Sequence, residues 1–301
     1  MSQGMSEPTG DDAATKVFVA HRNLLFTVAY EMLGSAADAE DVLQETWLRW
    51  AEVPLEEVRD HRAYLVRITT RLALNRIRTL SRRKETYVGP WLPEPLLTAP
   101  DVAEDAELAD SLSTAVLLVL ETLSPTERAV FVLREVFALG YDEIAAAVDK
   151  SPAAVRQIAH RARDHVAERR PRESVSAAEA RHALERFRDA ATGGDLQSLL
   201  DVLAPDVVLF SDGGGVVQAA RKPIHGAEKV LRFFAGLATK YGIPRFELTS
   251  VNRAPGMLIY FGEEVDGVVT LHVEDGMVTG LYYVRNPSKL SGVVEQVHLE
   301  R

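Results

Sequence analysis

The chain has 301 residues, a formal net charge of −10 and no cysteine. This length predicts two or three domains with separate cores, and the lack of cysteine excludes disulfides, thiol catalysis and cysteine-ligated zinc. No apolar run approaches the roughly 18 residues of a membrane span, and residues 1–15 are polar and acidic rather than a signal peptide, so we expect a cytoplasmic protein with a flexible N-terminal tail.

Residues 16–84 are predicted to form three helices along which the charge is separated. The helices are expected over residues 16–33, over the segment DAEDVLQETWLRWAE with Asp38 as its cap, and over residues 61–84. Residues 31–57 hold eight acidic residues and one arginine, whereas residues 59–84 hold nine basic residues and one aspartate. An evenly solvated surface needs no such segregation. The pattern therefore predicts two partners of opposite charge, or one large partner with two kinds of surface.

The outer faces of the second and third helices follow from their periodicity. On the second helix, the expected buried residues are Val42, Leu43, Thr46, Trp47 and Trp50. The outward residues are then Asp41, Gln44, Glu45 and Leu48. On the third helix, the expected packed residues are Tyr64, Leu65, Ile68 and Leu72, and one polar stripe is formed by Arg67, Arg71, Asn75, Arg78 and Arg82. Like charges four residues apart repel each other, so the stripe predicts a nucleic-acid partner, with a solvated basic face as the alternative.

Residues 87–113 form an acidic linker that contains no lysine or arginine. Most of it is expected to lack regular structure until a helix begins near Glu107. Its segment WLPEPL, residues 91–96, is stiffened by two prolines, and Trp91 is expected to dock on another surface. A plain solvated tether is the alternative.

Residues 141–170 are predicted to form a helix-turn-helix, with the turn at Asp149 and Lys150. Ser151 is the expected cap of the second helix and Pro152 its first residue. The buried face of that helix is expected to hold Val155, Ile158, Ala159, Ala162 and Val166. Its outer face and flanks hold Ala153, Arg156, Gln157, His160, Arg161 and Arg163. Such a helix suits the DNA major groove, although an ordinary helical hairpin is the alternative, and Asp164 and Glu168 would repel phosphates.

Residues 176–301 are predicted to form a separate domain. Helices are expected over residues 177–191, 195–203 and 226–240, and strands over residues 207–210, 246–251, 257–261, 265–273 and 277–284. Asp266-Gly267 and Asp275-Gly276 are expected to be hairpin turns between apolar runs. Helices followed by strands predict an α+β fold with a curved antiparallel sheet.

Three residues of this domain are candidate acid–base groups, namely Asp212, His225 and His272. A carboxylate in an apolar pocket could act as a general base. However, Asp212 precedes three glycines in an expected turn, His225 stands at a helix start, and His272 lies in a strand. We therefore favour structural roles and assign no catalytic residue, metal or cofactor. A fused enzyme or small-molecule sensor acting through Asp212 and His225 is the alternative function.

The segment DAEDVLQETWLRW, the arginine-rich helix, the linker and the helix-turn-helix together resemble bacterial sigma factors of the extracytoplasmic-function (ECF) class. The resemblance covers residues 16–170 and implies a transcription initiation factor that binds core RNA polymerase and promoter DNA. It implies that the coiled coil of the polymerase β′ subunit is bound by Asp38, Asp41, Gln44, Glu45 and Leu48. It also implies that the polar stripe and the loop 53–60 capture the −10 strand, and that the helix-turn-helix reads the −35 element.

The order of elements after residue 176 resembles the SnoaL-like (NTF2-like) cone, whose sheet wraps a pocket. Three motifs make the whole chain resemble the ECF sigma factors with a fused SnoaL-like domain. They are WLPEP (Trp91, Leu92, Pro93, Glu94, Pro95), DGGG (Asp212, Gly213, Gly214, Gly215) and NPSKL, with Asn286, Pro287, Lys289 and Leu290. Val216 stands where that group has a basic residue. The resemblance implies that the extra domain modulates sigma activity within one polypeptide, and a small ligand in its pocket is one further expectation.

The expected domain organisation is an all-α sigma2 domain over residues 16–86, the linker, an all-α sigma4 domain over residues 114–172 and the SnoaL-like domain over residues 176–301. We predict that the three motifs meet in space. Trp91 is expected to supply the apolar contact area, and Lys289 and Leu290 are expected in an exposed tail that covers the joint.

Overall fold

The computed structural model describes residues 10–84, 86–98, 113–169 and 175–293, without the side chains of residues 10–12 and 81–84. The chain divides into two compact units. Of the described residues, one unit contains 10–81 and 123–167, and the other contains those within 82–122 and 168–293. None of the helices in these described ranges is long and apolar enough to cross a membrane.

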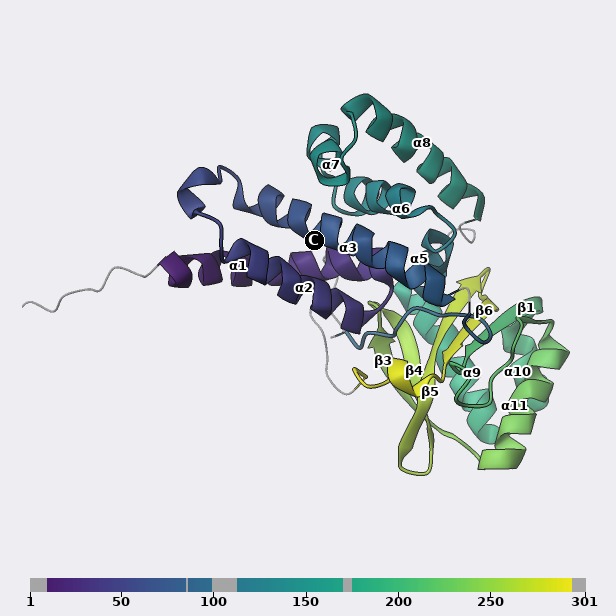
Figure 1. Cartoon of the computed structure of the whole chain (residues 1–301). Helices are drawn as coiled ribbons and strands as arrows, with labels where there is room; N and C mark the ends of the chain where they lie inside the picture. Colours follow the sequence, from purple (N-terminus) through teal and green to yellow (C-terminus); the bar gives the residue numbers. More distant parts are fainter. Residues whose placement is uncertain (1–9, 85, 99–112, 170–174, 294–301) are drawn as a thin grey trace, which may run out of the picture. The chain divides into compact units, whose positions relative to one another are not determined.

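The first unit begins with three helices, α1 (Gly10–Leu33), α2 (Ala36–Trp50) and α3 (His61–Lys84), with a short 3₁₀ turn at Leu55–Glu57 (Figure 1). Helices α1 and α2 are antiparallel. The end of α2 lies at the start of α1, where the indole of Trp50 donates to the Ala14 carbonyl at 2.9 Å. The prediction that Asp38 caps α2 is wrong. Ser35 is the cap, and its hydroxyl accepts from the Asp38 amide at 3.2 Å, so that the Asp38 carboxylate serves another contact.

The first unit also holds the helix-turn-helix. This part of the unit contains α6 (Pro125–Phe131) and a π-helical turn (Val132–Val136), followed by the helix-turn-helix itself, α7 (Tyr141–Val148) and α8 (Pro152–Arg169). Asp149 adopts the left-handed conformation at φ 57°, which turns the chain between α7 and α8, and Ser151 accepts from the Ala154 amide at 3.2 Å. The predicted boundaries, turn and cap of the helix-turn-helix are therefore confirmed.

The second unit contains an open six-stranded sheet in the order β2-β1-β6-β5-β4-β3. Its elements are α9 (Ala177–Gly193), α10 (Leu196–Val202), β1 (Leu203–Asp212), β2 (Ile224–His225), α11 (Ala227–Tyr241), β3 (Arg245–Val251), β4 (Ala254–Phe261), β5 (Glu264–Glu274), β6 (Met277–Val284) and a 3₁₀ turn at Pro287–Lys289. The predicted α+β class is confirmed, although β1 pairs with β6 in parallel rather than antiparallel. These two strands are joined through the rest of the domain and not by a hairpin, which permits the parallel pairing.

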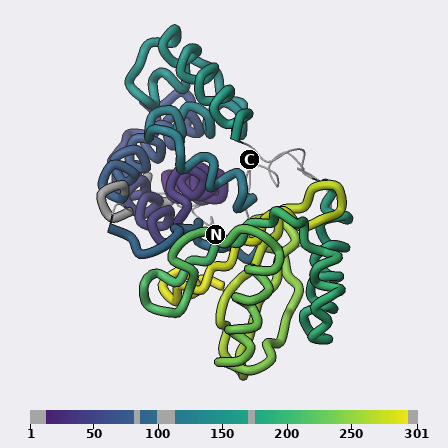
Figure 2. The backbone as a smooth tube through the Cα atoms, turned by 90° about the vertical axis from the view of Figure 1, so that its right-hand side faces the viewer, coloured from purple at the N-terminus to yellow at the C-terminus, as the bar shows by residue number. Residues whose placement is uncertain are grey.

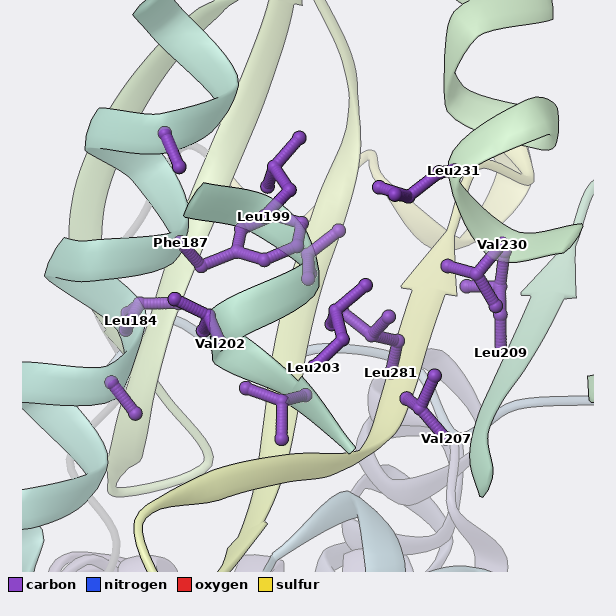
Figure 3. Close-up of a cluster of buried hydrophobic side chains, with 14 of the residues drawn as sticks. Leu184, Phe187, Leu199, Val202, Leu203, Val207, Leu209, Val230, Leu231 and Leu281 are labelled. Carbon is purple, nitrogen blue, oxygen red and sulfur yellow. The ribbon is translucent and has the colours of Figure 1, made fainter. Parts of the chain in front are cut away.

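One face of this sheet packs against helices. Helix α9 packs on β3, β4 and β5, and α11 packs on β1, and the same layers are visible in the view turned by 90° (Figure 2). Figure 3 shows that Phe187 of α9, Leu199 of α10 and Leu231 of α11 point into one apolar core with strand residues such as Leu281. The burial of this core against the sheet is the main stabilising term of the domain.

The other face of the sheet receives the linker and α5 (Thr114–Leu120). Because neighbouring residues of a strand point to opposite faces, Tyr283 belongs to the helix-covered core, whereas Tyr282 and Val284 pack with Leu92 of the linker and Ala115 of α5. Helix α5 therefore belongs structurally with the C-terminal domain. The expected helix start near Glu107 lies outside the described residues.

The two predicted hairpin turns have different outcomes. Asp275 and Gly276 form the β5–β6 turn, with φ values of 50° and 74°, as predicted. The turn predicted at Asp266-Gly267 is wrong, because both residues lie inside β5. Tyr260 pairs with Val265 and Ile259 pairs with Gly267, so Asp266 is the extra residue of a β-bulge. A bulge uses the same turn-forming residue types as a hairpin, which explains the wrong prediction.

Candidate functional site

The acidic face of α2 is arranged as predicted. Asp41, Gln44 and Glu45 are exposed, and Leu48 is 65% exposed. The guanidinium of Arg76 on α3 lies 2.6 Å from carboxylate oxygens of both Asp38 and Asp41. Its hydrogen bond to Asp38 raises the pKa of Arg76. Arg76 thus holds Asp38 and Asp41 of the acidic face in place. The sequence did not predict this role, because Arg76 is not part of the polar stripe of α3.

The polar stripe of α3 is present, and one of its members is engaged by α7. Arg71, Asn75 and Arg78 are exposed, and Arg78 donates to the Asn75 side-chain oxygen at 3.1 Å. Arg71 donates to the Ala146 carbonyl at 2.9 Å, near the C-terminus of α7, where carbonyls attract cations. Arg67 is half-buried and lies over the ring of Tyr64. The side chain of Arg82 lies outside the described part of the chain.

The outer face of α8 also matches the prediction. The predicted residues Ala153, Arg156, Gln157, His160, Arg161 and Arg163 are all exposed, and the five predicted core residues of α8 are buried. Arg163 is held by Glu135 at 2.6 Å, and this hydrogen bond raises the pKa of Arg163. His160 lies 3.4 Å from Asp164. The arrangement presents short, polar and basic side chains on one helix face, which is the composition used for reading a DNA groove.

In the second unit, the Asp212 carboxylate joins the linker to the C-terminal domain. Asp212 is the last residue of β1 and is fully buried. Its oxygens accept from the Tyr87 hydroxyl at 2.6 Å, the Leu92 amide at 2.9 Å, the Gly214 amide at 3.0 Å and the Lys289 ammonium at 2.8 Å. We call Tyr87, Leu92, Asp212, Asn286 and Lys289 the Asp212 cluster. It brings together residues from the linker, the DGGG motif and the NPSKL motif.

The Lys289 ammonium is the cation of the Asp212 cluster. Its side chain is 11% exposed, and it also donates to the Leu92 carbonyl and lies 4.1 Å from the centre of the Trp91 ring. Burial lowers the pKa of Lys289, whereas Asp212 opposes that shift. The expectation of an exposed tail at Lys289 is therefore wrong. The 3₁₀ turn at Pro287–Lys289 folds this residue inward, where it compensates a buried carboxylate.

The apolar part of the contact comes from leucines rather than from Trp91. Leu92 is fully buried and Leu96 is 2% exposed, whereas Trp91 is only half-buried. Pro93, Glu94 and Pro95 between them are also buried. The prediction that Trp91 supplies the apolar area is thus wrong in its residue. Trp91 instead covers the Lys289 ammonium with its ring face.

The glycines of the DGGG motif permit close backbone approach. Gly214 has φ 63°, and a Cβ atom there would lie 2.5 Å from the Asn286 side chain. The Asn286 amide donates to the Tyr87 hydroxyl at 2.8 Å, and its oxygen accepts from the Ser288 amide at 3.1 Å. Val216, at the position where the resembling group has a basic residue, is 75% exposed. Glycine at position 214 is therefore required for Asn286 to reach the linker.

A second linker contact was not predicted. Leu97 forms an antiparallel bridge with Val251, so this part of the linker adds to the edge strand β3. The backbone amide of Asn252, in the β3–β4 turn, donates to the Leu96 carbonyl at 2.8 Å. The side-chain oxygen of Asn252 accepts from the Leu96 amide at 2.9 Å. Asn252 is 1% exposed and has φ 51°. An asparagine in a turn is so common that the sequence carried no signal for this role.

The three candidate acid–base groups have different surroundings. Asp212 accepts four hydrogen bonds from other groups, His225 is exposed, and His272 lies 3.1 Å from Glu274. None of the three lines the apolar cavity between the sheet and its helices. Asp212 thus has the structural role that the sequence favoured.

Comparison with known families gives the class of this protein. The family model Sigma-70 region 2 matches residues 17–83, and the model Sigma-70, region 4 matches residues 113–166. The first match covers most of α1, all of α2 and nearly all of α3. The second begins just before α5 and ends within α8. These are the regions that carry the acidic face, the polar stripe and the helix-turn-helix.

Relatives over nearly the whole length make the assignment more particular. The chain is 36% identical to the ECF RNA polymerase sigma factor SigJ of Mycobacterium tuberculosis over 289 residues, which are 91% of this chain and 92% of SigJ. It is 33% identical to the probable ECF RNA polymerase sigma factor SigI of that species, over 93% of this chain and 95% of SigI. The crystal structure of M. tuberculosis SigJ matches with a TM-score of 0.76 at 34% identity, over 92% of this chain and 98% of that chain. The chain belongs to the ECF RNA polymerase sigma factor family, and it is an alternative sigma factor of transcription initiation that interacts with RNA polymerase and promoter DNA.

Proposed function

We propose that the exposed face of α2 binds the coiled coil of the polymerase β′ subunit. The proposal is supported by the outward position of Gln44, Glu45 and Leu48 and by Arg76, which holds Asp38 and Asp41 in place. An exposed leucine within an acidic rim is suited to a partner helix that offers an apolar groove and basic residues.

The two DNA-binding helices serve different forms of the promoter in this proposal. The stripe on α3 binds the melted −10 strand, because spaced arginines track one backbone and Asn75 can bond a base. Helix α8 reads the −35 element as duplex, because its exposed Gln157 and Arg161 are long enough to reach base edges. We infer that the protein acts in the cytoplasm, with polymerase and promoter.

The C-terminal domain regulates the sigma factor by holding the linker, as we propose. The observation that carries this is the Asp212 carboxylate, which accepts from Tyr87 and Leu92 of the linker and from Lys289 of the NPSKL motif. A linker held at Leu92 and Leu97 is not available to enter polymerase channels, and it limits the separation of the two DNA-binding regions. Release of the linker is therefore the activating step.

Run-off transcription with purified core polymerase tests this regulation. Lys289→Met keeps the apolar stem of the side chain and removes the cation of Asp212, so we expect more specific transcript than from the unchanged chain. Lys229→Met is the matched control, because Lys229 is exposed on α11. Equal transcript from both variants and the unchanged chain would refute the regulatory role of the Asp212 cluster.

A catalytic role for the C-terminal domain has less support, and we infer a non-enzymatic regulator. Asp212 is saturated with donors, and His225 lies outside the apolar cavity. A general base must reach the proton that it removes. Turnover of a small molecule that Asp212→Asn abolishes would overturn this inference.

A further inference from the structure

A cavity of about 300 Å³ lies between the helices and the inner face of the C-terminal sheet. Its walls include Phe187 of α9, Leu199 of α10, Phe234 of α11 and Ile259 of β4, and no charged side chain of the described residues lines it. Leu196, another lining residue, is 58% exposed, and Ile243, beside the lining residue Pro244, is 80% exposed. Large exposed apolar side chains beside an apolar cavity are typical of a ligand entrance.

The chemistry of the walls defines the class of ligand. An ion in this cavity would lose its hydration without gaining a charged partner, which is strongly unfavourable. Apolar cavities of about 150 Å³ already bind benzene, so a cavity twice as large suits an uncharged molecule of two or three rings or of similar branched shape.

The cavity wall is directly linked to the Asp212 cluster. Tyr283 lines the cavity, and its hydroxyl donates to Asp266, whose carboxylate pairs with Arg285 at 2.6 and 2.8 Å. The Arg285 amide in turn donates to the Asp212 carbonyl at 2.7 Å. Burial and the nearby Asp266 raise the pKa of Tyr283 well above its usual value, so the hydroxyl stays protonated and donates. Four residues therefore connect the cavity on one face of the sheet to the linker contact on the other.

We propose that this cavity binds an uncharged, apolar small molecule, and that its occupancy loosens the Asp212 cluster through Tyr283, Asp266 and Arg285. A ligand against the Tyr283 ring displaces the hydroxyl from Asp266, and Asp266 then no longer orients Arg285 beside Asp212. This inference rests on the proposed regulatory role of the Asp212 cluster only for its effect on transcription. Ligand binding and its coupling to the cluster can be measured without polymerase.

The first test is a fluorescence titration of the full chain with the uncharged probe N-phenyl-1-naphthylamine. We expect saturable binding at one site per chain. Ala191 and Ala238 are half-buried lining residues, so Ala191→Phe or Ala238→Phe should fill the cavity and weaken binding about tenfold, equivalent to about 1.4 kcal/mol. Ala178→Phe, at an exposed position of α9, is the matched control and should bind as the unchanged chain does. No saturable binding, or equal binding by all the variants, would overturn the proposal.

The second test uses the reciprocity of coupled equilibria. If the probe loosens the Asp212 cluster, a chain with a loosened cluster must bind the probe more tightly. Lys289→Met should therefore bind it about fivefold more tightly, and Gly214→Ala, which disturbs Asn286, should do so as well. Tyr283→Phe keeps the ring but removes the hydroxyl that bonds Asp266, so this variant should still bind the probe. Adding Lys289→Met to Tyr283→Phe should not change the affinity for the probe further. If Lys289→Met and Gly214→Ala bind the probe with the affinity of the unchanged chain, the coupling through Tyr283, Asp266 and Arg285 is refuted. The regulatory role of the Asp212 cluster would not be affected by that result.

Discussion

Asp212 shows how one buried carboxylate can join segments that lie far apart along the chain. A buried charge is costly unless it is paired and hydrogen-bonded, and here Lys289, Tyr87 and two backbone amides satisfy it. Burying Leu92 adds roughly 1.5–3 kcal/mol to the linker contact. Linker release costs at least this free energy, because it also exposes Leu96 and breaks the hydrogen bonds to Asp212.

Gly214→Ala tests this contact at the scale of single atoms. The substitution costs roughly 1–2 kcal/mol of stability through its positive φ, and its Cβ would also displace Asn286. Gly276→Ala is the matched control, because Gly276 has φ 74° but no atom within 4 Å of the added Cβ. Hydrogen exchange of the Leu92 amide should be faster in Gly214→Ala than in Gly276→Ala. Equal exchange rates would mean that Asn286 does not support the linker contact.

At the scale of elements, β6 has two functions because its side chains alternate. Tyr283 faces the helix-covered core, whereas Tyr282 and Val284 face Leu92 and α5. Helix α8 shows the same division around its axis, with a buried apolar face and an exposed polar one. On α8, Arg163 is fixed by Glu135 on the flank, whereas Gln157 is exposed on the outer face.

This division predicts two kinds of DNA-binding defect on α8. Gln157→Ala should lose about 1–3 kcal/mol at particular −35 bases and little on other sequences, because it removes a base contact. Arg163→Ala should weaken binding equally on all −35 sequences and lower the salt slope by about one unit, because it removes a phosphate contact. Binding measured on a set of single-base −35 variants at several salt concentrations separates the two. The same loss on every sequence for Gln157→Ala would contradict base readout.

At the scale of the whole molecule, the last described segment completes the C-terminal domain instead of extending from it. Arg285 is 2% exposed and pairs with Asp266, so a truncation after Val284 would leave that half-buried carboxylate without its cation. A truncation after Arg285 keeps this pair and removes Asn286 and Lys289.

The chain truncated after Arg285 should therefore remain folded and give more run-off transcript than the full chain. The reason is that Asp212 loses its cation and the linker loses Lys289 and Asn286 as partners. Truncation after Val293 is the control, since it keeps the whole NPSKL motif. Thermal unfolding reports on the fold, and transcript yield reports on the linker. Unchanged transcript from a folded chain truncated after Arg285 would contradict linker control.

The features that could be predicted from the sequence are those that depend on local patterns. Apolar periodicity predicted the outward faces of α2, α3 and α8. The residue types preferred in turns and caps predicted the turn at Asp149, the cap at Ser151 and the Asp275-Gly276 hairpin. These features need only neighbours within a few residues, and such neighbours are readable from spacing. The motif residues could likewise be selected, because loops rich in glycine and proline are places of recognition.

The role of each residue within the linker contact could not be predicted in the same way. Lys289 is buried on Asp212, Leu92 rather than Trp91 fills the apolar site, and Asp266 forms a bulge for Arg285 instead of a turn. Tyr87 and Asn252 lie outside the three motifs, yet both form hydrogen bonds that join the linker to the C-terminal domain. Their partners lie 125 and 156 residues away along the chain. Burial and pairing at such separations depend on the folded sheet, because local propensity contains no information about which distant group will satisfy a buried charge or amide.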